Sequence, residues 1–293
     1  MTALKQFHIG DARITKIVEQ LLPPAPASFL LPQSNAQTLR QHAAWLGEEH
    51  LSPVEQTLRV SCHGWLVQTA THTVIIDTAS GNHKNRPLNP LFHQQNTPWL
   101  ENLRQAGVAP EDVDYVLLTH LHVDHVGWNT RWVDGKWVPT FPNARYVYSA
   151  AEYDFYADPT HVKAPSAGVF EDSVQPVVDA GLGWPIGTDQ PSPLDGFQFH
   201  PTRGHSHDHL SISYSANGEV ALFAGDVMHH PIQIAEPQWN SVYCEYPEAA
   251  RQSRRWVLDF ATAQEALYCS SHFAGSSAGR ITRLDDHFVW HPL

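Results

Sequence analysis

Residues 119–128, THLHVDHVGW, bring three histidines and one aspartate together within six positions. Neutral imidazole nitrogens and carboxylate oxygens are common ligands of Zn²⁺ and similar divalent ions. His120 and His122 are two residues apart, so their rings would share one face where the chain is extended. A turn after them would bring Asp124 and His125 in from another side. The packing of a protein core does not require such a run of polar residues. The run therefore predicts a metal-binding loop.

Three other places put a histidine or an aspartate just after a predicted strand. His205 follows FHPTRG, Asp226 follows ALFAG, and His272 follows LYCSS. Loops at the carboxyl ends of strands are where open α/β sheets build their sites. Taken singly, each of these residues would be an ordinary hydrogen-bonded or turn residue. Together with the first loop they supply five histidines and two aspartates, enough for two ions if one aspartate bridges them.

Four further histidines are interpreted as ordinary structural or surface residues, although the first two follow Asp226 closely: His229, His230, His63 and His83.

Composition limits the partners of this chain of 293 residues. It has 30 acidic and 18 basic residues and a formal net charge of -12, which argues against a nucleic-acid or anionic-membrane partner. We therefore expect a small-molecule substrate. The composition does not determine the oligomeric state, and a homodimer is one of the possible states.

Cysteine content and hydropathy bear on the location of the protein. Cys62, Cys244 and Cys269 are too sparse for a disulfide framework or a thiolate metal site, and we expect reduced thiols. The N-terminal residues lack the apolar core of a signal peptide, and the apolar runs are too short to span a bilayer. These features predict a cytoplasmic protein.

Strands and helices that position these residues alternate along the chain. Strands are expected at residues 12–22, twice within 64–77, at 113–120, at 197–202, on both sides of Asn217-Gly218, and at 265–272. Helices are expected at residues 34–47, closed by Gly47, at 97–107 with Thr97 as N-cap, from a capping box at 149–152, and at 247–261. This order favours α/β layers in a single domain of residues 1–293, with residues 23–53 as a covering excursion.

Several motifs then resemble one known family. THLHVDHVG resembles the signature loop of the metallo-β-lactamase superfamily, GHSHDH its second metal loop, LFAGD its bridging-aspartate loop, and SSH its last histidine loop. VIIDTASGN is similar to the family's early strand that ends in an aspartate. The resemblance spans residues 64–272 and implies a four-layer αββα sandwich with a dinuclear site, most simply of two Zn²⁺ ions, at one edge.

The resemblance also implies a role for each site residue. The implied ligands are His120, His122 and His205 for the first metal, Asp124, His125 and His272 for the second, and Asp226 as the bridge. Asp77 would support a ligand. Where the family has Thr-Pro-Gly in the second loop, this chain has Ser206-His207-Asp208. His205 and His209 keep the family's spacing, so we expect His205 to be the ligand and His209 to be a supporting residue of the site. His207 would compete with His205 for the role of ligand.

Hydrolysis is the chemistry that these residues predict, by a hydroxide held between two metals and with Asp124 as the proton shuttle. HVGWN and GDVMHHPIQ are similar to a subgroup of N-acyl-homoserine lactone lactonases and organophosphate hydrolases. Trp128 and Phe141 would line a pocket for a neutral, partly hydrophobic lactone or ester.

The alternatives are a phosphotriester substrate and, from another class, a mononuclear iron oxygenase-type enzyme. A thioester hydrolase, a nuclease and a non-catalytic metal-binding relative fit the sequence less well.

Overall fold

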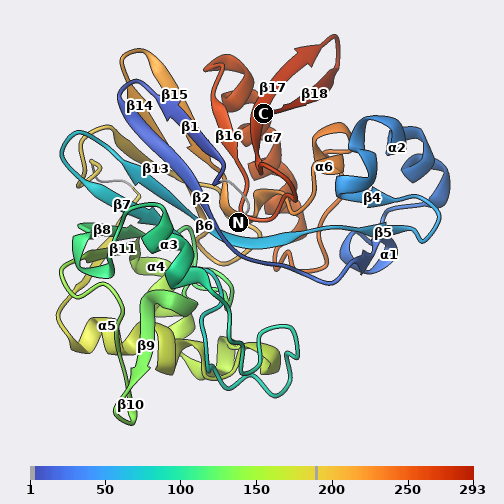
Figure 1. Ribbon diagram of the computed structural model, residues 1–293. Coiled ribbons are helices and arrows are strands. Elements are labelled where there is room, and N and C mark those ends of the chain that lie inside the picture. Colours follow the sequence, from blue (N-terminus) through green and yellow to red (C-terminus); the bar gives the residue numbers. More distant parts are fainter. Residues whose placement is uncertain (1–3, 189–190) are drawn as a thin grey trace. The chain divides into compact units, whose positions relative to one another are not determined.

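Two segments of chain, far apart in the sequence, build each of two units. The computed structural model describes residues 4–188 and 191–293 (Figure 1). Unit 1 consists of Met1–Gln20 and Cys62–Pro191, and unit 2 of Leu21–Ser61 and Ser192–Leu293. The single domain expected for residues 1–293 stays a prediction.

A seven-stranded sheet forms the frame of unit 1. In spatial order its strands are β1 (Gln6–Ile9), β2 (Ala12–Leu21), β6 (Ser61–Gln68), β7 (Thr73–Ile76), β8 (Tyr115–Leu117), β11 (Arg145–Ser149) and β12 (Gly183–Ile186). The last four strands run parallel. Carboxyl ends of parallel strands meet at one edge of a sheet, so the segment after β7 and the segment after β8 begin side by side.

Helices and short turns complete unit 1. They are α3 (Trp99–Gln105), η1 (Pro110–Asp112), η2 (Gly127–Asn129), α4 (Ala150–Ala157), η3 (Pro159–His161), η4 (Ala164–Ser166), the π-helical η5 (Phe170–Val174) and α5 (Gln175–Asp179), with a separate hairpin of β9 (Thr130–Val133) and β10 (Lys136–Pro139). Ser149 caps α4 by accepting the Glu152 N–H at 3.1 Å, as predicted.

The expected N-cap of α3 was wrong. The Thr97 hydroxyl lies 3.2 Å from the Glu19 carboxylate and donates to it, and the helix begins after Pro98 without a side-chain cap. The buried carboxylate of Glu19 takes the hydroxyl that would otherwise cap the helix.

A six-stranded sheet forms the frame of unit 2. Its strands are β13 (Phe197–Pro201), β14 (Leu210–Ala216), β15 (Glu219–Phe223), β16 (Leu267–Cys269), β17 (Ala278–Leu284) and β18 (His287–Pro292). All neighbours are antiparallel except β15 and β16. Asn217 and Gly218 join β14 to β15 with φ angles of 52° and 82°, which confirms the predicted hairpin turn.

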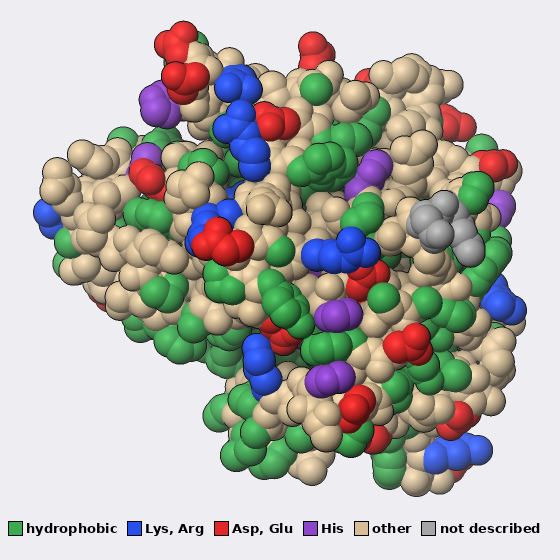
Figure 2. Space-filling model, turned by 180° about the vertical axis from the view of Figure 1, so that it is seen from behind, with side chains coloured by type: hydrophobic (Ala, Val, Ile, Leu, Met, Phe, Trp, Pro, Cys, Tyr) green, Lys and Arg blue, Asp and Glu red, His purple; other side chains and the backbone are tan. Residues whose placement is uncertain are grey.

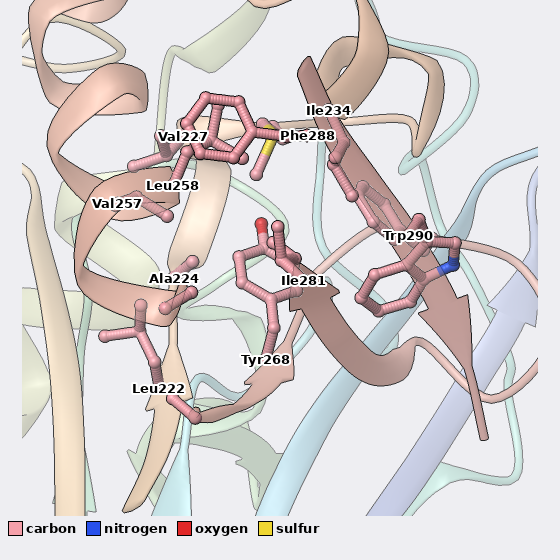
Figure 3. Packing of buried hydrophobic residues seen from close by; sticks show 14 residues of the cluster. Leu222, Ala224, Val227, Ile234, Val257, Leu258, Tyr268, Ile281, Phe288 and Trp290 are labelled. Atoms are coloured by element: carbon pink, nitrogen blue, oxygen red, sulfur yellow. The ribbon is translucent and has the colours of Figure 1, made fainter. Parts of the chain in front are cut away.

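The main core of unit 2 lies between this sheet and α7 (Pro247–Ala263). Val257 and Leu258 of the helix meet Leu222, Tyr268 and Ile281 of the sheet (Figure 3). These side chains are almost wholly buried. Burial on this scale fixes the helix against the strands that lead to Asp226 and His272.

Residues 23–53 fold within unit 2 on a smaller apolar cluster that includes Leu30, Leu39, Leu58 and Ile232. The elements of this segment are β3 (Ala25–Pro26), α1 (Ala27–Leu30), α2 (Ala36–His50) and β4 (Leu51–Ser52). The remaining elements of unit 2 are β5 (Thr57–Leu58), η6 (Gly225–Val227) and α6 (Ile232–Ala235). Gly47, with φ of 63°, kinks α2 but does not close it as expected.

Charged side chains on the face drawn in Figure 2 lie singly or in small groups, with Lys and Arg among Asp and Glu. Within residues 4–188 and 191–293, no helix is both long enough and apolar enough to cross a membrane.

Candidate metal centre

The loop after β8 gathers its histidines within unit 1. The ring of His120 lies 4.6 Å from that of His122 and 4.0 Å from that of His125, measured between centroids. His120 and His125 are buried, whereas His122 and Asp124 are partly exposed. The Asp124 carboxylate lies 3.8 Å from Nε2 of His125. The four predicted ligands of this loop therefore form one group.

Asp77, at the end of β7, holds two of these imidazoles. Its carboxylate lies 2.8 Å from Nδ1 of His125, and it accepts both the N–H and the hydroxyl of Thr119 at 2.8 Å. The same hydroxyl lies 3.0 Å from Nδ1 of His120. Because Nδ1 of each ring is engaged, Nε2 is the nitrogen that His120 and His125 can offer to a metal.

His122 is oriented the other way round. Its Nε2 lies 2.9 Å from the hydroxyl of Tyr156, which comes from α4. Nδ1 is therefore the nitrogen that His122 can offer. The sequence predicts a helix that begins with the capping box at 149–152, but it does not connect Tyr156 with the site, since no local pattern relates two residues from separate elements.

A second group surrounds Asp226 in unit 2. The Asp226 carboxylate lies 3.2 Å from Nε2 of His205, 3.2 Å from Nε2 of His229 and 3.1 Å from Nε2 of His272. All four residues are buried. Nδ1 of His272 is held by the Ser61 carbonyl at 2.9 Å, so its Nε2 is directed to the carboxylate.

His229 belongs to this group, which corrects its interpretation as an ordinary histidine. His205, Asp226 and His229 bring one potential ligand atom each to within 4.8 Å of one another. The ring of His229 also stacks on that of His272, with centroids 5.1 Å apart and planes 15° from parallel. Its neighbour His230 instead packs in the interior, with Nε2 3.0 Å from the His50 carbonyl.

The structure separates the three histidines of the GHSHDH loop. His205 is buried against Asp226, whereas His207 is partly exposed and lies 3.4 Å from the Tyr246 hydroxyl. His209 accepts the Asp226 N–H at 2.9 Å through Nε2 and meets the Thr202 hydroxyl through Nδ1. His209 therefore supports the backbone of Asp226 with Nε2, and the Thr202 hydroxyl holds its ring through Nδ1.

Gly204 allows the turn that precedes His205. Its φ is 123°, and a Cβ there would lie 2.1 Å from the backbone nitrogen of Ala250. Glycine is the residue that tolerates both this conformation and this close approach.

Glu19 in β2 is a buried support of unit 1 that the sequence analysis missed. Its carboxylate accepts the N–H of Ser80 at 2.9 Å, that of Gly81 at 3.1 Å and the indole N–H of Trp128 at 2.8 Å. It thereby ties the segment after Asp77 to the segment after His125. A single acidic residue in an amphipathic strand gives no local signal of this role.

The two aromatic residues expected to line a substrate pocket are core residues of unit 1. Phe141 has no exposed surface and packs edge-on against Trp99, and Trp128 stacks on the same Trp99 with centroids 5.9 Å apart. This packing corrects the expectation that Phe141 lines a substrate pocket. The ring of Trp128 is likewise packed against Trp99.

A buried ion cluster anchors the segment after β7. Arg86 forms two hydrogen bonds of 2.6 and 2.7 Å with Asp172, and Lys84 donates to the Thr130 hydroxyl at 2.6 Å and lies 3.6 Å from Asp172. Its ammonium also lies 3.6 Å from the ring centre of Trp137. Burial lowers the pKa of Lys84 to about 7, although Asp172 acts in the opposite direction.

Each unit thus presents imidazole nitrogens and a carboxylate with supported orientations. This donor set suits borderline divalent ions such as Zn²⁺. The buried position of most donors also suits a bound cation, which would balance the buried carboxylate of Asp226.

A family model described as "Metallo-beta-lactamase superfamily" matches residues 58–272. Two curated relatives, probable metallo-hydrolases of Mycobacterium bovis and Mycobacterium tuberculosis, are each 27% identical over 192 residues. These alignments cover 58% of this chain and 57% of each relative, so the chain matches little more than half of their length.

Solved structures resemble the chain over almost its whole length. One is a crystal structure of the hydrolase AbOPH, described as a member of the beta lactamase superfamily, with a TM-score of 0.81 and 24% sequence identity. The alignment covers 100% of this chain and 98% of the AbOPH chain. The dizinc quorum-quenching lactonase AidC, bound to a product, has a TM-score of 0.79 and 18% identity and covers 99% and 97%. The chain shares the fold of these proteins, and the predicted α/β class is confirmed.

Proposed function

The chain belongs to the metallo-β-lactamase superfamily, and we propose that it is a metal-dependent hydrolase. Its substrate is a neutral, partly hydrophobic small molecule, in which it opens a lactone or cleaves a carboxylic ester. One observation carries the proposal. Nδ1 of His120, His125 and His272 each has a hydrogen-bond partner, and this supports metal binding through Nε2.

We further propose that the seven ligands expected from the motifs hold two divalent ions, most simply Zn²⁺. One ion would be held by Nε2 of His120, Nδ1 of His122 and Nε2 of His205, and the other by Asp124, Nε2 of His125 and Nε2 of His272. The Asp226 carboxylate would serve both ions. Two such ions, when bound, make a water molecule acidic near neutral pH and stabilise negative charge that develops on a carbonyl oxygen.

Asp124 is the residue to which we assign proton transfer. Its carboxylate is partly exposed and neighbours His125, so a substrate can reach it. It takes the proton of the attacking water and returns it to the alkoxide that leaves when the acyl–oxygen bond breaks. An alkoxide is a strong base, and the ring would close again unless this oxygen were protonated.

The supporting residues keep this arrangement in place. Asp77 orients His125 directly and His120 through Thr119, and His209 holds the backbone of Asp226. Such supports raise the basicity of a ligand and limit its rotation.

A combined metal and substrate assay tests the proposal. We expect protein purified without chelator and supplied with zinc to contain two ions per chain and to hydrolyse lactones and aryl esters. Removing the metal with a chelator should abolish hydrolysis, and zinc should restore it. The panel should include phosphotriesters and thioesters.

Three results would contradict this assignment. Cleavage of phosphotriesters without cleavage of any lactone or ester would replace the substrate class by the alternative one. A single iron with oxygen consumption would replace the reaction class. A metal-loaded protein that cleaves nothing on the panel would leave metal binding without the proposed hydrolysis.

A further inference from the structure

Two exposed aromatic side chains lie next to the Asp226 group of unit 2. Phe29, in α1, is 53% exposed, and Tyr243 is 44% exposed. Their rings meet edge to face with centroids 6.3 Å apart. The ring of Tyr243 in turn lies 5.8 Å from that of His229, whose Nε2 contacts Asp226. A continuous row of rings therefore leads from the buried carboxylate to solvent.

Backbone contacts hold this aromatic pair although its members come from distant parts of the chain. The N–H of Val242 donates to the Leu30 carbonyl at 2.9 Å, which joins the segment of Tyr243 to the end of α1. The N–H of Tyr243 donates to the Ser241 hydroxyl at 3.0 Å. Leu30 is anchored in the buried cluster of unit 2. The backbone that carries both rings is thus held in place before any ligand binds.

A single exposed aromatic residue needs no explanation. Here, however, two such rings are in contact with each other and adjoin a group of predicted metal ligands. Val242, the residue before Tyr243 in the chain, is also exposed. Binding sites for small molecules combine apolar walls with a few polar groups at the reacting end, and this row of residues has that composition.

We propose that Phe29 and Tyr243 form the apolar subsite that binds the hydrocarbon part of the substrate and so determine its specificity. The inference rests on the proposed hydrolase function and assigns the substrate class more closely. It is a lactone or ester that carries an alkyl or aryl side chain. Aromatic faces bind such groups with little loss of conformational freedom, and His229 lies between this subsite and the carboxylate.

The test compares two lactones with the same ring, γ-butyrolactone and γ-decalactone, of which the second alone carries a hexyl chain. Phe29→Ala and Tyr243→Ala should each lower kcat/KM for γ-decalactone about tenfold, mainly through KM, and should change that for γ-butyrolactone little. Phe29→Leu and Tyr243→Phe, which keep apolar surface and disturb packing less, should retain most of the selectivity.

Trp45→Ala is the matched control. Trp45 is 40% exposed in the same unit, and its indole donates to His42 on the same helix, α2. The control should preserve the ratio of kcat/KM between the two lactones. Loss of the ratio in Trp45→Ala to the same extent as in Phe29→Ala would overturn the inference.

A binding measurement separates this inference from the proposed function. The ring-opened hydroxy acid of γ-decalactone is titrated into the zinc-loaded protein by calorimetry, so no turnover is needed. We expect Phe29→Ala to weaken binding about tenfold. If the wild type binds this acid by means of Phe29 but hydrolyses no lactone, the subsite stands and the hydrolase proposal fails. If the wild type hydrolyses both lactones and the variants alter neither selectivity nor binding, the hydrolase proposal stands and the subsite is wrong.

Discussion

Nδ1 of His125 lies 2.8 Å from Oδ2 of Asp77, a residue 48 positions earlier in the chain. Both side chains are buried, and the same carboxylate accepts two hydrogen bonds from Thr119. Both carboxylate oxygens of Asp77 are therefore engaged, Oδ1 by the Thr119 N–H and Oδ2 by the Thr119 hydroxyl and by His125.

Asp77→Asn should therefore weaken metal binding. The amide NH₂ would face a donor of Thr119 or His125, and the imidazole of His125 would lose its charged partner. Loss of such a support typically costs 10–100-fold in metal affinity, and we expect about that range. Competition with a chromogenic chelator measures it. Asp114→Asn, whose carboxylate accepts the Thr73 N–H in the same unit, is the control. Equal zinc affinities in both variants would show that Asp77 has no such role.

Asp124→Asn should lower kcat more than it raises KM. Proton transfer by a positioned side chain contributes ~10²–10⁴-fold, and kcat should fall by about that factor for lactones with a poor leaving group. Aryl esters, whose phenolate leaves without help, should be affected less. Steady-state kinetics at measured zinc content provides the comparison. Undiminished kcat on a poor-leaving-group lactone would rule out the shuttle role.

His205→Ala and His207→Ala should differ in metal content, although the two residues are close in sequence. His205 is buried beside Asp226, and His207 lies near the exposed Tyr246. Elemental analysis should find less metal in His205→Ala and an unchanged amount in His207→Ala. The opposite pattern would mean that the altered loop binds through His207.

Glu19→Gln should destabilise unit 1. The amide NH₂ of glutamine would face N–H donors of Ser80, Gly81 or Trp128, and a buried donor left unsatisfied costs ~1–3 kcal/mol. We expect the free energy of unfolding to fall by about 3 kcal/mol in denaturant titrations. Glu101→Gln, on the exposed side of α3, should have little effect. Similar stabilities for the two variants would contradict a supporting role for Glu19.

The free energy of unfolding should rise with pH between about 7 and 10.5 because of Lys84. The pKa of Lys84 is lowered to about 7 in the folded state from 10.5, so the folded protein binds fewer protons than the unfolded chain in this window. The cost of burying the charged Lys84 ammonium lowers the free energy of unfolding in full below pH 7, and this cost is absent above pH 10.5. Asp172 lies 3.6 Å from the ammonium, and Arg86 forms two hydrogen bonds with the same carboxylate.

Lys84→Met should flatten this pH dependence, whose slope approaches about 1.4 kcal/mol per pH unit. Lys136→Met, at an exposed position of β10 in the same unit, should leave it unchanged. Denaturant titrations across the window measure the slopes. An identical slope in wild type and Lys84→Met would show that Lys84 is not the titrating group.

Local patterns were enough to predict the elements that carry the ligands. The run from His120 to His125 is one short motif, and Asn217-Gly218 is a turn whose φ angles restrict its residues. Strand ends could be located because apolar runs stop where polar residues begin. The ligand positions follow from these features, which are all contained in a few consecutive residues.

Long-range packing explains what the sequence did not reveal. Glu19 meets Ser80 across 61 positions, and Tyr156 meets His122 across 34. Phe141 was assigned to a pocket because an aromatic side chain suits a core and a wall equally well. His229 resembled its neighbour His230, yet the two rings point to different surroundings.

The division of each unit between two separated segments has a consequence for synthesis on the ribosome. Residues 21–61 leave the ribosome before most of unit 1, but the rest of unit 2 begins only at residue 192. Unit 1 can close once residue 191 has emerged, with the early segment looped out and its apolar cluster still lacking Ile232 and Trp239. That interval exposes hydrophobic surface on a nascent chain, so trigger-factor-type chaperones and slow codons upstream of residue 192 should affect the yield of native protein.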